Sequence, residues 1–269
     1  MTVSAQAPRL PSLIEQIEAA QGRARTVFRM KFAGTWALLL GLLIFGLWAT
    51  GNIDRTFIEL WGPFILGGAA ITVFLSVVSI VVATLLAIVG AIARLSRNAY
   101  ISGVASLYVS VVRGTPLLVQ IAFIYFALPQ FGIFIDSIPS GIIALSFNYG
   151  AYMTEVFRAG IQAVPRGQRE AAASLGLPER LIMRRIVLPQ AFRIVIPAIG
   201  NDFVAMIKDS ALVSVISVQE LLWRARQVGT QEFRNFEALL IAAAIYWIMT
   251  IVFSFGQERL EKRMARGDR

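Results

Sequence analysis

The sequence contains no cysteine and no histidine among its 269 residues. It therefore has no thiolate nucleophile, no disulfide and no imidazole to carry protons near neutral pH, and it lacks the two commonest ligands of transition metals. Charged residues make up 15% of the chain, against about 25% in soluble domains, while 57% of the residues are hydrophobic. This composition argues against a soluble enzyme and favours an integral membrane protein.

Long apolar runs are the main feature that is present. A helix needs about 20 apolar residues to cross a bilayer. Runs of about this length predict six transmembrane helices, at 33–50, 64–93, 115–134, 138–157, 194–217 and 238–255. The second run is long enough to tilt or protrude, and residues 101–112 predict an interfacial helix that leads into the third run.

The distribution of positive charge predicts how these helices are oriented. The net charge is +9, which suits either nucleic acid or an anionic lipid surface, and the apolar runs favour lipid. Most Lys and Arg residues lie before the first run, near 94–97, in the link 158–193 and in the C-terminal tail. The links on the other side hold only Arg55, Arg224, Arg226 and Arg234. Because positive charge collects on the cytoplasmic side, both termini and the long link are predicted to be cytoplasmic.

The link 158–193 is too polar to cross a membrane and predicts two short helices. Pro165 suits a first helical turn, Glu170 lies near the positive end of that helix, and Gly176 can adopt the left-handed conformation that closes it. Pro178 then begins a second helix, and Pro189 discourages its continuation. The result is a helix-turn-helix that fits a groove in a soluble partner. A segment that only fixes topology and binds anionic headgroups is an alternative; a DNA reader is not favoured, because there is little room for a third helix.

The motifs in and around this link resemble a known family. Glu170-Ala171-Ala172, Gly176 and Ile186-Val187-Leu188-Pro189 resemble the EAA loop of ABC-transporter permease subunits. The flanking segments resemble the polar amino-acid uptake permeases: Arg113-Gly114-Thr115-Pro116-Leu117-Leu118-Val119-Gln120, Ala151-Tyr152-Met153-Thr154-Glu155, Gly167-Gln168-Arg169-Glu170 and Leu188-Pro189-Gln190-Ala191-Phe192-Arg193. The resemblance extends from about Gly67 to the C-terminal end. Such permeases commonly have five crossings, so this chain has an extra helix in front.

The resemblance implies an all-α polytopic bundle that acts as one subunit of an importer in the bacterial inner membrane. Its implied partners are an ATP-binding subunit dimer that uses ATP and Mg, a second permease subunit, identical or homologous, and an external amino-acid-binding protein. The link 158–193, called here the coupling loop, would contact the ATPase through Gly167, Glu170, Ala171, Ala172, Gly176, Leu188 and Pro189. The chain lacks the Gly-x-x-x-x-Gly-Lys-Ser/Thr phosphate loop, so it is not expected to hydrolyse ATP or to bind a cofactor or metal.

This division of the chain gives three expected regions. Residues 1–62 hold the cytoplasmic N-terminal segment and the extra helix, residues 63–258 form the permease domain, and residues 259–269 form a basic cytoplasmic tail. Arg113-Gly114-Thr115-Pro116 predicts a break in the helix before the third crossing, which is either a simple helix entry or a gate.

Several polar residues are predicted to lie at membrane depth, where each needs a partner or a function. Asn201, Asp202, Lys208 and Asp209 fall on one stripe of the fifth predicted helix, and no opposite charge lies three or four residues away from any of them. They either hold helices or subunits together or line the path of a zwitterionic substrate. Glu155 is a further candidate, although Arg158 can pair with it. Asn148, Tyr149 and Tyr152 suit either the path or the core.

Two other functional classes compete with the importer. An ion-coupled secondary transporter or channel subunit would work without an ATPase, and a membrane scaffold would transport nothing. The sequence does not distinguish which amino acid is carried, because a separate binding protein selects it.

Overall fold

The computed structural model describes residues 13–49 and 54–265. Every regular element within these ranges is helical, which confirms the predicted all-α class. The chain forms two compact units, Met1–Arg55 and Thr56–Arg269. The expected boundary at residues 62 and 63 lies a little later, inside the first helix of the second unit.

The first unit contains one long helix, α1 (Leu13–Ala49), which includes the first predicted crossing up to Ala49; residue 50 lies outside the described residues. Residues 21–46 of this helix are long and apolar enough to span a membrane. Large side chains such as Phe28, Leu38 and Phe45 are exposed along it. An apolar helix with this exposure suits lipid as its surroundings.

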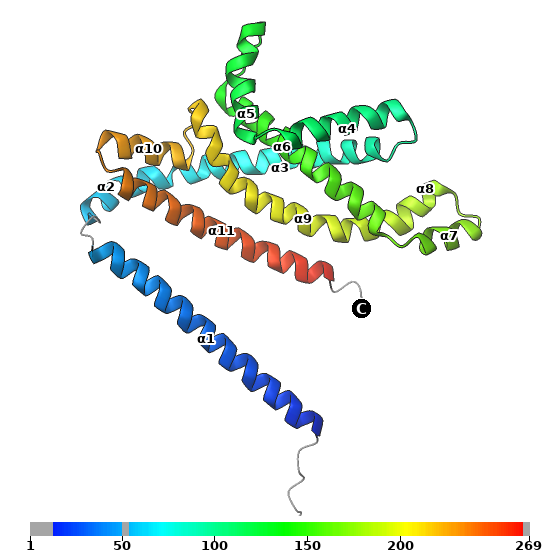
Figure 1. The fold of residues 1–269 in the computed structure, drawn as a ribbon, viewed down its shortest axis with the longest axis horizontal. Helices are drawn as coiled ribbons and strands as arrows, with labels where there is room; N and C mark the ends of the chain where they lie inside the picture. Colours follow the sequence, from blue (N-terminus) through cyan, green and yellow to red (C-terminus); the bar gives the residue numbers. More distant parts are fainter. Residues whose placement is uncertain (1–12, 50–53, 266–269) are drawn as a thin grey trace, which may run out of the picture. The chain divides into compact units, whose positions relative to one another are not determined.

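The second unit is a bundle of helices joined by short links (Figure 1). Its elements are α2 (Arg55–Leu66), α3 (Gly68–Arg94), α4 (Ala99–Gly114), α5 (Leu117–Ala122), the π-helix η1 (Phe123–Ala127), the 3₁₀-helix η2 (Leu128–Phe131), α6 (Ser137–Ala163), α7 (Arg166–Ser174), α8 (Glu179–Ile182), the π-helix η3 (Met183–Val187), α9 (Leu188–Asp209), the 3₁₀-helix η4 (Ser210–Ile216), α10 (Leu221–Gln231) and α11 (Asn235–Ala265).

The core of the bundle lies where α3, α6 and α9 run side by side (Figure 1). Leu75, Leu145, Met153 and Met206 are buried there. Small residues allow close approach between helices; a Cβ atom on Gly90 of α3 would lie only 2.3 Å from the hydroxyl of Thr154 on α6. A second apolar cluster joins α2, α10 and α11. The core thus fixes α6 and α9, the helices on either side of the coupling loop.

Fewer helices meet a simple apolarity criterion than the six that the sequence predicts. Among the described residues, Gln21–Gly46, Arg55–Arg94 and Asn235–Met264 are long and apolar enough to cross a membrane, and the bent pair Ala99–Gly114 and Leu117–Phe131 meets the criterion together. The predicted crossings at 138–157 and 194–217 are present as α6 and as α9 with η4, which carry more polar residues. The number of crossings therefore stays a prediction.

The chain bends sharply where the sequence predicts a break. The axes of α4 and the following helical segment meet at 105°, and Thr115 and Pro116 at the bend both have extended backbone. Proline cannot donate a backbone hydrogen bond and disfavours helical backbone in the residue before it. The predicted break at Arg113-Gly114-Thr115-Pro116 is confirmed.

The predicted end of a helix before Pro189 is wrong. Helical structure continues without interruption from Glu179 through η3 into α9. A proline within an α-helix clashes with the carbonyl four residues earlier, and the wider π-helical turn at Met183–Val187 relieves this conflict. The second helix of the coupling loop is therefore the beginning of the long helix that crosses the bundle.

Candidate functional site

The coupling loop forms a compact turn between α7 and α8. The backbone N–H of Leu177 donates to the carbonyl of Ala172 at 3.2 Å, and the N–H of Gly176 donates to that of Ala173 at 2.9 Å. This pair of bonds is a Schellman motif, which requires a left-handed residue after the helix, and Gly176 has φ +77°. The predicted role of Gly176 in closing the first helix agrees with this geometry.

The loop has its own small core. Val164, Ala172, Ile182 and Val187 are buried against one another. The guanidinium of Arg169 donates to the carbonyl of Ile161 at 2.8 Å and ties α7 to the end of α6. These contacts make the turn a stiff body joined directly to α6 and α9.

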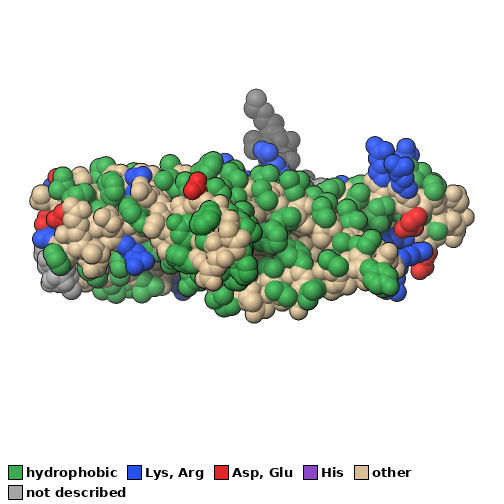
Figure 2. All heavy atoms as spheres, turned by 90° about the horizontal axis from the view of Figure 1, so that it is seen from above, with side chains coloured by type: hydrophobic (Ala, Val, Ile, Leu, Met, Phe, Trp, Pro, Cys, Tyr) green, Lys and Arg blue, Asp and Glu red, His purple; other side chains and the backbone are tan. Residues whose placement is uncertain are grey.

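The predicted coupling residues divide between this core and the surface. Ala172 is buried and holds α7 against α8, and Leu188 is half-buried. Gly167, Glu170, Ala171, Gly176 and Pro189 are exposed. Leu175 is also exposed, at 82%. Basic and acidic side chains gather at this end of the molecule, beside a largely apolar surface along the bundle (Figure 2).

A cavity of about 560 Å³ lies between the α4–α5 bend and helices α6 and α9. Its lining is rich in polar residues: Arg113, Gly114, Thr115, Pro116, Leu117, Asn148, Tyr149, Tyr152, Asp202, Ala205 and Asp209. Two of the predicted path residues, Asp202 and Asp209, thus face the same space. Asn148, Tyr149 and Tyr152, which the sequence left undecided between path and core, face it too.

The polar groups of the cavity are only partly satisfied by one another. The hydroxyl of Tyr149 donates to Asp209 Oδ2 at 2.8 Å, and the guanidinium of Arg113 lies 5.0 Å from the centre of the Tyr152 ring. Asp202 Oδ2 is buried and has no hydrogen-bond partner among the described residues. An unpartnered buried carboxylate oxygen in a cavity is available to a cationic group.

The other predicted path residues lie outside the cavity. Asn201 accepts a hydrogen bond of 2.6 Å from Gln257 on α11, and Lys208 is exposed. The stripe on α9 is therefore divided, since only Asp202, Ala205 and Asp209 face the cavity. Both Asn201 and Lys208 lie on the surface of the single chain.

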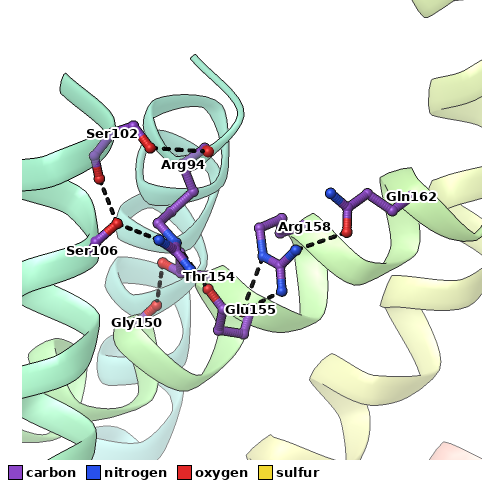
Figure 3. Close-up of polar contacts among 8 residues, drawn as sticks. All are labelled: Arg94, Ser102, Ser106, Gly150, Thr154, Glu155, Arg158 and Gln162. Carbon is purple, nitrogen blue, oxygen red and sulfur yellow. Dashed lines mark hydrogen bonds and ion pairs between the residues drawn. The ribbon is translucent and has the colours of Figure 1, made fainter. Parts of the chain in front are cut away.

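Glu155 belongs to an ion-pair network at the far end of α6 (Figure 3). Its carboxylate accepts from the Arg158 guanidinium at 2.7 Å, as the spacing of the two residues predicts, and from Arg94 of α3 at 3.1 Å. Arg94 also contacts Ser106 of α4, and Arg158 donates to Gln162 at 2.7 Å. No local pattern pointed to Arg94 as a partner of Glu155, because the two residues lie in different helices. The network connects α3, α4 and α6 just before the coupling loop.

One buried carboxylate was missed by the sequence analysis. Glu220 is fully buried and accepts from the backbone N–H groups of Leu222 and Trp223, at 2.9 and 2.7 Å, and from the hydroxyls of Tyr246 and Thr72. Burial raises the pKa of this carboxyl, and the hydrogen bonds from Tyr246 and the backbone partly oppose the rise. Glu220 begins α10 and joins it to α3 and α11. Its only local signal is its place just before three apolar residues, Leu221, Leu222 and Trp223.

Comparison with known sequences gives a consistent result. A family profile described as "Binding-protein-dependent transport system inner membrane component" matches residues 83–266. The chain is 41% identical over 208 residues to the L-cystine transport system permease protein TcyB of Bacillus subtilis (strain 168), covering 76% of this chain and 88% of that protein. It is 40% identical over 207 residues to the arginine transport system permease protein ArtQ of the same organism, covering 77% and 94%.

Solved structures are similar as well. The crystal structure of an amino acid ABC transporter with histidines matches with a TM-score of 0.76 and 40% identity, over 78% of this chain and 99% of that one. An inward-facing conformation of the MetNI methionine ABC transporter matches with a TM-score of 0.62 at 17% identity, over 79% of this chain and 99% of that one, and this likeness concerns the fold alone.

Proposed function

Because the chain belongs to the inner membrane components of binding-protein-dependent transport systems, we propose that it forms the membrane path of an ATP-driven importer for a polar amino acid. The match over residues 83–266, which includes both the cavity and the coupling loop, carries this proposal. The two relatives support the substrate class, since they are named as permeases for L-cystine and for arginine. The chain is the permease subunit and not itself an enzyme.

The coupling loop would transmit the movement of a separate ATPase dimer, which uses ATP and Mg. Gly167, Glu170, Ala171 and Gly176 form an exposed surface for this partner together with Pro189, while Ala172 and Leu188 support it. The loop is joined to α6 at one end and is continuous with α9 at the other. A displacement of its stiff core would therefore move α6 and α9, the two helices that line the cavity. The loop would act as a lever, through a rigid-body movement of the kind seen in other switching proteins.

The cavity would receive the amino acid during passage. The ammonium group of the substrate can pair with Asp202 or Asp209, and its carboxylate can pair with Arg113. These pairs would replace the contacts with water that each charged group loses. Tyr149 holds Asp209 in place. Asn201 and Lys208 lie on the exposed side of α9, where a second permease subunit, identical or homologous, would complete the path. Glu155 would act at the path's cytoplasmic end through its pairs with Arg94 and Arg158.

The orientation follows from the same proposal. The coupling loop must face the cytoplasm to reach the ATPase, and both chain termini would then be cytoplasmic as well. The opposite end of the bundle would face the external amino-acid-binding protein. The surface along the bundle is rich in exposed apolar residues and suits lipid.

A reconstitution experiment tests the function. The tagged chain is purified in mild detergent, the co-purifying subunits are identified, and the complex is placed in vesicles with its binding protein. We expect amino-acid uptake that requires ATP and continues after ion gradients are dissipated. Uptake that stops with the gradient while ATP is maintained would instead support an ion-coupled transporter, and no uptake under any condition would support a scaffold.

A further inference from the structure

The link between α9–η4 and α11 contains three arginines, and only one of them has no partner in the described chain. This link forms the end of the bundle opposite α7 and α8 (Figure 1). Arg224 donates to the carbonyls of Phe64 and Gln219, at 3.0 and 3.2 Å. Arg234 pairs with Glu237 at 3.6 Å. Among the described residues, no ion pair or hydrogen bond involves the side chain of Arg226, which is exposed.

Arg226 lines a polar cavity of about 420 Å³. The lining consists of Ser214, Val215, Trp223, Arg226, Gln227 and Thr230. None of these residues is acidic. Nearby, Glu220 is buried beneath α10 and already accepts four hydrogen bonds, and Glu232 lies beyond the cavity at the C-terminal end of α10. The cavity thus offers one free guanidinium together with hydroxyl and amide groups, a set that suits a carboxylate.

An exposed apolar residue follows the end of α10. Phe233 follows α10, is 93% exposed and has φ +56°. A bulky residue in the left-handed region is strained, and such residues persist where a structure or function requires them. Exposed aromatic residues and arginines are both typical of protein-binding surfaces.

We propose that Arg226 and its cavity bind an acidic side chain on the external amino-acid-binding protein, with Phe233 after the same helix as a further exposed contact. The inference rests on the proposed function, which places α10 outside the cell. Docking at this surface would also connect the binding protein to the substrate path. Ser214 and Val215 line the Arg226 cavity and belong to η4, which directly continues α9 after Asp209. A partner bound here contacts η4, which continues from the helix that lines the substrate cavity.

The test measures how uptake depends on the concentration of the binding protein. Vesicles contain the complete transporter with wild-type chain, Arg226→Glu, Arg226→Gln or Arg226→Lys, and the binding protein is the one that supports wild-type uptake. Gln231→Glu is the matched control, because it adds a negative charge to the same helix outside the cavity. Co-purification of the subunits verifies assembly of each variant.

We expect Arg226→Glu to raise the half-saturating concentration of binding protein about tenfold or more, because a close charge pair becomes a repulsion. Arg226→Gln should give a smaller rise, and Arg226→Lys and Gln231→Glu should stay within about twofold of wild type. Higher salt should raise the half-saturating concentration of binding protein more for the wild type than for Arg226→Gln, since salt screens the charge pair that Arg226 makes.

An unchanged half-saturating concentration in Arg226→Glu, while the wild type imports amino acid with ATP, would overturn the docking proposal and leave the proposed function intact. A lower maximal uptake rate with an unchanged half-saturating concentration of binding protein would also overturn it. That result would mean that Arg226 contacts the second permease subunit and not the binding protein. If the wild type shows no ATP-driven uptake with any binding protein, the proposed function itself fails.

Discussion

Tyr149 on α6 donates a hydrogen bond of 2.8 Å to Asp209 at the end of α9. These two helices lead into and out of the coupling loop, so the bond joins them at the cavity as the loop joins them at the other end. A movement of the loop that separates α6 from α9 must break or redirect this bond. The charge offered to a substrate therefore depends on the relative position of the two helices.

Neutralising the cavity carboxylates should impair transport without preventing assembly. We expect Asp202→Asn and Asp209→Asn each to reduce the uptake rate about tenfold or more, because hydrogen bonds between charged groups contribute roughly 1.5–3 kcal/mol. The measurement is initial uptake in vesicles, with subunit co-purification as the assembly check. Asp136→Asn, an exposed change outside the cavity, should have no effect. Full uptake in both cavity variants would show that neither Asp202 nor Asp209 contributes to the substrate path.

The Arg94–Glu155 pair should stabilise the bundle measurably. Both side chains are less than a third exposed and come from different helices. We expect a double-mutant cycle of Arg94→Gln and Glu155→Gln to give a coupling energy of about 1 kcal/mol. Thermal unfolding in detergent would show a decrease of roughly 2–4 °C in Tm for either single variant. Lys262→Gln, which breaks the exposed pair with Glu258, should leave Tm unchanged. Additive effects of the two substitutions would contradict a direct interaction.

Changing Gly176 should uncouple the transporter from its ATPase. Valine at φ +77° is strained by roughly 1–2 kcal/mol and opposes the Schellman turn. We expect Gly176→Val to lower the amount of amino acid imported per ATP hydrolysed, or to prevent the ATPase from co-purifying. Gly103→Val is a control in an open helical position with no atom within 4 Å of an added Cβ. Wild-type ATP-stimulated uptake by Gly176→Val would count against the lever.

The coupling loop was largely predictable because its signals are local. The left-handed turn at Gly176 depends on a few neighbouring residues, and so does the helix start at Glu179. Continuation through Pro189 was not predictable from local rules. It depends on a π-helical turn at Met183–Val187, which lies beside the tertiary contacts of Ile182 and Val187 in the loop core.

The cavity was predictable only in part. Helical spacing shows which residues share one face of α9, but it does not show which other helices those residues contact. The spacing placed Asn201, Asp202, Lys208 and Asp209 together. A stripe wide enough to include all four spans two sides of α9, and only the side that meets Tyr149 forms the cavity. Contacts between distant segments, such as Arg94 with Glu155, carry no pattern within a single helix.

Gly68 should be intolerant of any side chain. A Cβ atom there would lie 2.7 Å from the backbone N and Cα of Leu221, where α10 begins. Overpacking of this kind typically costs about 1–3 kcal/mol, so Gly68→Ala should lower Tm in detergent by several degrees. Gly62→Ala is the matched control, since its nearest contact would be an ordinary 3.9 Å. Equal Tm values for the two variants would show that α3 and α10 are less closely packed than the 2.7 Å contact at Gly68 implies.

Single-cysteine labelling should place the two ends of the bundle on opposite sides of the membrane. The natural chain has no cysteine, so each variant reports on one position without background. Glu179 in the coupling loop and Gln231 at the end of α10 are both exposed. In right-side-out vesicles, an impermeant maleimide should label Gln231→Cys at once, because only thiols that meet water form the reactive thiolate. It should label Glu179→Cys only after the vesicles are opened. Leu85→Cys, an exposed position in the middle of α3, should stay unlabelled in both conditions because it faces lipid. Labelling of Glu179→Cys in sealed vesicles would place the coupling loop outside, where no ATPase could reach it, and α10 would then have no access to an external binding protein.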